Sequence, residues 1–89
     1  MAKVIIKNLT GEQIDSMGIK GWPIWEKESS RFDWEYVGDE HCLILEGEVV
    51  VETDNGNFHI KAGDYVIFKD GLKCVWDIKK DIRKHYRFE

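Results

Sequence analysis

Hydrophobic and polar residues alternate along most of this chain, with the period of two that is typical of half-buried β-strands. The clearest case is the segment 31–36, where Phe32, Trp34 and Tyr36 share one face and charged residues occupy the other. Further strands are predicted at 4–6, 22–25, 41–45, 48–53, 58–60, 65–68, 73–78 and 82–88. Short strands broken by frequent turns indicate a β-sandwich or a small barrel.

Signals for helix are nearly absent. Thr10 is followed three residues later by Gln13, a capping-box spacing that predicts one short helical turn over 10–17. Pro23 lacks the donor that a central strand needs, so 22–25 is expected at a sheet edge. Gly47 permits a bend or bulge between two predicted strands, and the run 54–56 (Asp-Asn-Gly) predicts a hairpin turn. We therefore expect an all-β fold with at most one short helical turn.

The length of the chain, 89 residues, predicts a single domain over 1–89. A domain of this size buries a modest share of its surface, so its stability depends on dense packing or on association. The four Trp residues supply large buried areas. The predicted edges at 4–6 and 22–25 favour association with a second copy, and we expect a homodimer.

The net charge of -4 argues against nucleic acid or an anionic membrane as the main partner. The sequence shows no signal peptide and no long apolar run. The two cysteines, Cys42 and Cys74, are then expected to be free thiols in a reducing, cytoplasmic setting, although the sequence alone does not exclude a bond between them.

Two groups of residues resemble the paired sequence motifs of the cupin family. Glu40 is followed after six residues by Gly47, and Gly63 precedes Gly71, which precedes Cys74. The resemblance covers about residues 22–88 and is closest to the cupin domain of (S)-ureidoglycine aminohydrolases. The segments that carry this finer likeness are 22–26, 32–36, 45–47, 63–64, 74–76 and 83–86. The resemblance implies a small cupin β-barrel, the double-stranded β-helix or jelly roll.

In metal-binding cupins, two His and a Glu of the first motif join a His of the second around Mn, Fe, Ni or Zn. Glu40 matches the Glu of the first motif. One spacing places the two His positions at Trp34 and Tyr36, and a spacing longer by one places them at Asp33 and Glu35. Burial of the aromatic pair is favourable by about 1.5–3 kcal/mol per side chain of Phe size, whereas burial of two acids is costly. We therefore expect Trp34 and Tyr36 inside the barrel.

Cys74 stands where the resemblance places the His of the second motif. Cys42 lies two residues from Glu40 and therefore shares its face of the strand. Glu40, Cys42 and Cys74, with Tyr36, form a candidate site for a divalent metal such as Zn, Mn or Fe. His41 is out of phase with Glu40, so no imidazole is expected in this set. The alternative is that both cysteines are simply apolar packing residues.

Glu40 and Lys84 are the candidate catalytic residues. A carboxylate inside a barrel is costly unless it has a partner. Lys84 shares its strand face with the apolar residues at 82, 86 and 88, so it is placed to pair with Glu40, and either member of such a pair acts as an acid or base. The alternative is that Lys84 extends to solvent at the barrel rim.

These residues lead to three alternative functions. The first is a small cytoplasmic cupin that binds a small polar metabolite; the resemblance implies metal-assisted hydrolysis of a ureido or amino compound. The second is a metal-free binding module without catalysis, in which Trp34, Tyr36 and Trp76 stack on a planar ligand and Glu40 fixes its polar end. The third is a dimerising structural domain with a filled barrel. The sequence leaves open whether the protein is an enzyme.

Overall fold

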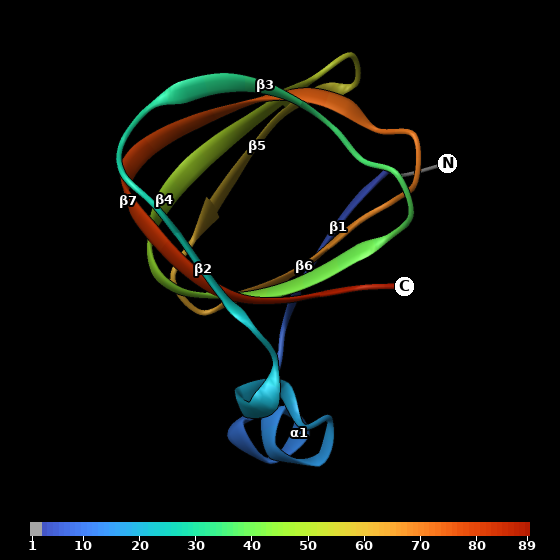
Figure 1. Cartoon of the computed structure of the whole chain (residues 1–89), viewed down its shortest axis with the longest axis vertical. Helices are drawn as coiled ribbons and strands as arrows, with labels where there is room; N and C mark the ends of the chain where they lie inside the picture. Colours follow the sequence, from blue (N-terminus) through green and yellow to red (C-terminus); the bar gives the residue numbers. More distant parts are fainter. Residues whose placement is uncertain (1–2) are drawn as a thin grey trace.

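The chain folds almost entirely into antiparallel β-strands, as the alternating pattern predicts (Figure 1). The structure is a computed structural model that describes residues 3–89. Its strands are β1 (Val4–Asn8), β2 (Ile24–Lys27), β3 (Arg31–Glu35), β4 (Glu40–Thr53), β5 (Gly56–Lys61), β6 (Asp64–Phe68) and β7 (Lys73–Phe88). The helical segments are α1 (Gly11–Ser16) and the 3-10 turn η1 (Ile19–Gly21).

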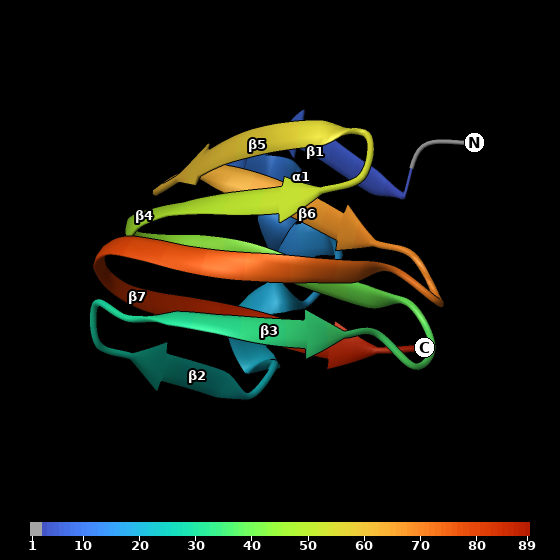
Figure 2. The same ribbon diagram turned by 90° about the horizontal axis from the view of Figure 1, so that it is seen from above.

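The two long strands β4 and β7 form the spine of the fold. They pair with each other from Glu40 opposite Phe88 to Glu52 opposite Val75. At one end of this spine the strand order is β1-β6-β4-β7-β2, and at the other end β5 pairs with β4 and β3 pairs with β7. The strands curl into a ring when viewed as in Figure 1, and Figure 2 shows β5, β4, β7 and β3 side by side. The predicted barrel is therefore present.

Two pairs of predicted strands are each one continuous strand, which corrects the sequence-based boundaries. β4 spans both 41–45 and 48–53, and β7 spans both 73–78 and 82–88. Gly47, with φ of 99°, lies in a stretch where the register between β4 and β7 shifts. Ile44 is buried before this bulge and Val49 after it, so the inward face changes from even to odd positions. The bulge redirects the strand without ending it.

The predicted helical turn is confirmed. Thr10 and Gln13 form both hydrogen bonds of the capping box at the start of α1. The 3-10 turn that follows was not predicted from the sequence. Both segments lie outside the ring of strands (Figure 1), where Ile19 packs in a second cluster with Leu43 and Tyr65. None of the helices within residues 3–89 has the length and apolarity needed to span a bilayer.

The predicted sheet edges are also confirmed, since β1 and β2 are the outer strands of the five-strand path. Each presents an exposed apolar side chain, Ile6 on β1 and Ile24 on β2. Pairing of these edges with a second copy stays a prediction. Inside the barrel, a continuous buried cluster of mostly aliphatic and aromatic residues comes mainly from β4, β6 and β7.

Candidate functional site

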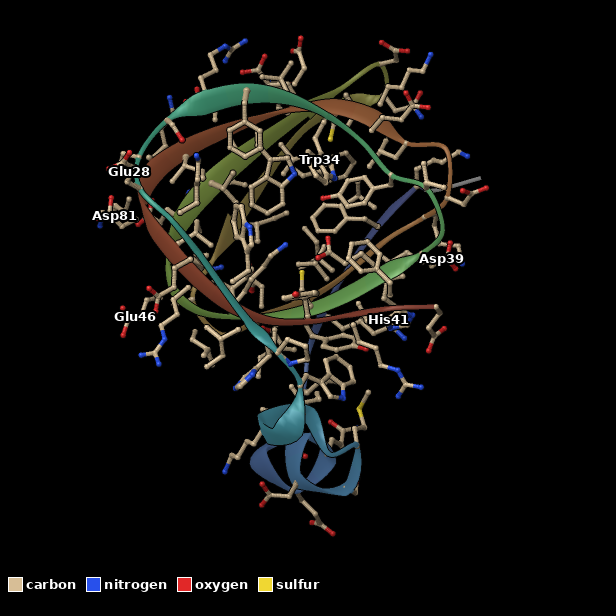
Figure 3. All side chains as sticks on the ribbon, in the orientation of Figure 1. Glu28, Trp34, Asp39, His41, Glu46 and Asp81 are labelled. Carbon is tan, nitrogen blue, oxygen red and sulfur yellow. The ribbon has the colours of Figure 1, made fainter. Side chains whose placement is uncertain are left out.

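The interior of the ring contains a cavity of about 250 Å³ beside the buried core. Its walls are mostly aromatic and its two charged residues form one pair. The lining residues are Trp25, Phe32, Trp34, Tyr36, Glu40, Trp76, Lys84, Tyr86 and Phe88. Figure 3 shows Trp34 on the inner side of β3, and His41 on the opposite, outer side of the ring. Trp34 and Phe88 are 48% and 51% exposed, which places them at the mouth of the cavity.

The two predicted catalytic residues meet in this cavity. The Lys84 ammonium donates a hydrogen bond to Oε2 of Glu40 across 3.0 Å. Glu40 is 4% exposed and Lys84 is 5% exposed, so both charges are withdrawn from bulk water. Glu40 begins β4 and Lys84 lies on the neighbouring segment of β7, which gives the pair a rigid two-strand support. The predicted ion pair is present, while its catalytic role stays a prediction.

Two indole rings flank the Lys84 ammonium. Nζ lies 4.9 Å from the ring centre of Trp25 and 4.8 Å from that of Trp76. A cation within about 6 Å of an indole face is attracted by the ring quadrupole. Trp25 was not predicted as a site residue, because the sequence places 22–25 only at a sheet edge. The pairing of β2 with β7 sets Trp25 directly opposite Lys84.

The predicted ligand-binding aromatics, Trp34, Tyr36 and Trp76, all line the cavity. Nε1 of Trp76 donates a hydrogen bond to the Tyr36 hydroxyl oxygen at 3.0 Å. Burial, with a smaller contribution from the Glu40 carboxylate, raises the pKa of Tyr36 well above its usual value. Tyr36 therefore stays a neutral phenol at physiological pH and retains a proton to donate to a ligand. Its ring stacks on Phe68 at 4.7 Å, which fixes its position.

Comparison with known proteins decides the family. Residues 15–86 match the EutQ-like cupin domain. The chain belongs to the EutQ-like cupin family. A crystal structure of a DUF861 family protein from Thermotoga maritima is 45% identical to this cupin, with a TM-score of 0.93 over 97% of this chain and 99% of that chain. No curated protein matches the chain. The predicted cupin fold is thus confirmed, and the narrower assignment to ureidoglycine aminohydrolases is not.

Structures of EutQ proteins share the fold at lower similarity. A putative ethanolamine utilization protein Q from Salmonella typhimurium is 24% identical, with a TM-score of 0.63 over 93% of this cupin and 66% of that chain. The EutQ protein of Clostridium difficile is 19% identical, with a TM-score of 0.66 over 93% of this cupin and 64% of that chain. This cupin thus spans about two thirds of each EutQ chain, and at these identities the likeness concerns the fold alone.

The two cysteines of this cupin are free and buried. Neither lines the cavity, and Cys74 instead lines a separate open hollow at the ends of β3, β4 and β7. Burial raises the pKa of Cys42 to about 12, with the Lys84 ammonium opposing this rise. Burial also raises the pKa of Cys74 to about 11. Both thiols are therefore protonated at neutral pH when no metal is bound, and neither reaches the cavity that contains Glu40.

The donor set does not fit the divalent metal that the resemblance implies. Within residues 3–89, no three His, Cys, Asp or Glu side chains are grouped to hold a metal ion. The predicted set of Glu40, Cys42 and Cys74 is therefore not assembled. The positions that the resemblance assigns to His carry Trp34 and Tyr36, which have no imidazole. The one acid in the cavity already has a cation, the Lys84 ammonium, at 3.0 Å.

The buried thiol of Cys42 predicts a loss of stability at alkaline pH. Its pKa rises from 9.0 to about 12 on folding, so its stabilising contribution is complete below pH 9 and is lost as pH rises toward 12. Since one pKa unit corresponds to about 1.4 kcal/mol, wild type should lose about 2 kcal/mol more than Cys42→Ala between pH 8 and about pH 10.5. Urea unfolding at each pH measures the free energy of unfolding of both proteins. If wild type and Cys42→Ala lose equal stability between these pH values, the prediction is contradicted.

Proposed function

We propose that this cupin binds a small, planar, largely apolar molecule with one polar end, and does so without a metal ion. The observation that carries the proposal is the Lys84–Glu40 pair, buried in a cavity whose remaining walls are aromatic. Apolar cavities with a few convergent polar groups are the usual form of small-molecule sites. A purely structural core would gain little from keeping this charged pair, since apolar residues of similar size stabilise a fold as well or better.

The chemistry of the lining defines the kind of ligand. A ligand ring stacks on the exposed Trp34 and packs beside Trp76, and a polar group reaches the ion pair. The Lys84 ammonium and the Tyr36 hydroxyl donate hydrogen bonds to ligand oxygens, while Glu40 accepts one from a ligand N–H or O–H. The volume of about 250 Å³ is slightly below the range of about 300–1,000 Å³ typical of ligand pockets. This favours a ligand of roughly one ring.

Metal-assisted hydrolysis of a ureido or amino compound is the second candidate. It is supported by the motif resemblance and by the adjacency of Glu40 and Lys84, which suits proton exchange with a bound substrate. The aromatic residues at the expected His positions, and the position of both thiols outside the cavity lining, weaken the metal part of this candidate. Proton transfer between substrate and the ion pair needs no metal, so hydrolytic activity and metal dependence are separate questions.

Tryptophan fluorescence provides the test of binding. Three of the four Trp residues line the cavity, so a Trp22→Phe background removes the one that does not. We expect benzoate, benzamide or benzyl alcohol to quench the tryptophan fluorescence of this variant, and the quenching to saturate as the probe concentration rises. Lys84→Met and Trp76→Phe should weaken binding of the best probe about tenfold, the effect of about 1.4 kcal/mol. Lys73→Met, which removes an exposed lysine of the same strand, is the matched control. The proposal would be overturned if the quenching never saturates. It would also be overturned if Lys73→Met weakens binding as much as Lys84→Met does.

A further inference from the structure

We propose that Lys84 forms a reversible covalent bond with the carbonyl group of a small aldehyde or ketone that enters the cavity. The inference rests on the proposed function, because the carbonyl compound must occupy the same aromatic cavity. It goes further by giving the Lys84 nitrogen the role of a nucleophile and by naming the chemical class of its substrate.

The placement of the Lys84 nitrogen is the first argument. Lys84 is the one buried lysine within residues 3–89, and every other lysine there is exposed or partly exposed. Its Nζ lies against the rings of Trp25 and Trp76, at 4.9 Å and 4.8 Å from their centres, at the wall of a cavity open to solvent. A buried amine on a fixed strand meets a bound carbonyl carbon in a restricted geometry, which favours reaction over that of a mobile surface lysine.

The position of Glu40 is the second argument, because the ammonium must lose a proton before it can attack. Oε2 of Glu40 is 3.0 Å from Nζ and accepts that proton along an existing hydrogen bond. Transfer of the proton along this hydrogen bond converts the ion pair into a neutral amine and a neutral carboxylic acid.

Lys84 and Glu40 alone supply and accept every proton that the covalent reaction requires. The Nζ lone pair attacks the carbonyl carbon, the carbonyl π electrons move to oxygen, and Glu40 protonates that oxygen. Glu40 then takes a proton from nitrogen to give the neutral carbinolamine. Glu40 returns this proton to the hydroxyl as the carbon–oxygen bond breaks, so that water leaves and a protonated imine remains. The reverse sequence, with water as the reactant, releases the carbonyl compound.

The product retains the electrostatics of the resting site, which is the third argument. The protonated imine carries the same single positive charge as the ammonium. It faces the same Glu40 carboxylate and the same indole rings of Trp25 and Trp76. The cavity therefore stabilises the covalent product with the contacts that it uses for the free lysine, and no charge is created or buried in the reaction.

Reductive trapping tests this inference on the wild-type protein. Benzaldehyde is added with sodium cyanoborohydride, which reduces an imine to a stable benzyl amine, and peptide mapping by mass spectrometry locates the label. We expect label at Lys84 at least tenfold above that at any exposed lysine, and loss of this preference in denaturant. Glu40→Gln should slow labelling at Lys84 about tenfold, whereas the control Lys73→Arg should leave it unchanged.

The outcomes separate this inference from the proposed function. If the extent of labelling increases with the solvent exposure of each lysine, and Lys84 is among the least labelled, the covalent inference is overturned. If benzyl alcohol still quenches the cavity tryptophans saturably in that case, the proposed binding function stands alone. If benzyl alcohol fails to bind and Lys84 is not labelled, both are overturned. The ten-fold preference is read on wild type, so the result does not depend on whether a variant folds.

Discussion

Replacing Lys84 with Met should destabilise this cupin by about 3–5 kcal/mol, the effect expected when one partner of a buried ion pair is removed. The substitution leaves the Glu40 carboxylate, which is 4% exposed, without its cation. The Met side chain fills a similar volume, so the loss reflects the unpaired charge and not a cavity. Urea unfolding followed by far-UV circular dichroism measures the change at pH 7.

A double variant supplies the decisive comparison for this prediction. Lys84→Met combined with Glu40→Leu replaces the pair by apolar residues and should be within about 1 kcal/mol of wild type, or more stable. Lys73→Met, at an exposed position of the same strand, should change stability by less than about 0.5 kcal/mol. If the double variant is as unstable as Lys84→Met alone, the unpaired charge is not the cause of the lost stability.

Substituting Gly47 with Ala should prevent folding or cost more than about 4 kcal/mol. A Cβ atom at this position would lie 2.2 Å from the carbonyl oxygen of Asp81 and 2.7 Å from that of Lys80. Both obstacles are backbone atoms of the paired strand β7, so no side-chain rotation relieves the overlap. The φ of 99° adds strain for any residue with a side chain. Solubility, circular dichroism and thermal unfolding report the effect.

Gly63 provides the matched control for this clash. Its φ of 95° is close to that of Gly47, but a Cβ there would meet nothing within 4 Å. Gly63→Ala therefore carries the backbone strain alone and should cost about 1–3 kcal/mol. The difference between the two variants isolates the contact between the bulge of β4 and β7. Equal losses in the two variants would show that this close approach does not constrain the fold.

The alternation of apolar and polar residues was sufficient to predict the barrel and the inward face of β3. It also placed Lys84 on the apolar face of its strand, where the structure shows it paired with Glu40. The continuity of β4 could not be predicted, because the bulge at Gly47 changes which positions face inward. A period of two identifies a face within one strand, but it carries no information across such a shift.

The metal prediction shows what strand parity cannot supply. Parity places Glu40 and Cys42 on one face, as the structure has them, yet it does not state which residue reaches the cavity and which ends in the packed core. Cys42 is 0% exposed and does not line the cavity, and Cys74 lines another hollow. Trp25 was missed because only the pairing of β2 with β7 brings it to the site, and strand parity does not reveal this pairing.

The central claim is that Lys84 takes the place of a metal ion as the cation of this cupin's binding site. Titration of the Trp22→Phe protein with its best probe, in EDTA and again in excess zinc, tests this most directly. We expect one dissociation constant for both conditions and a weakening of about tenfold in Lys84→Met under each. Binding that disappears in EDTA and returns with zinc, and that Lys84→Met leaves unchanged, would contradict it.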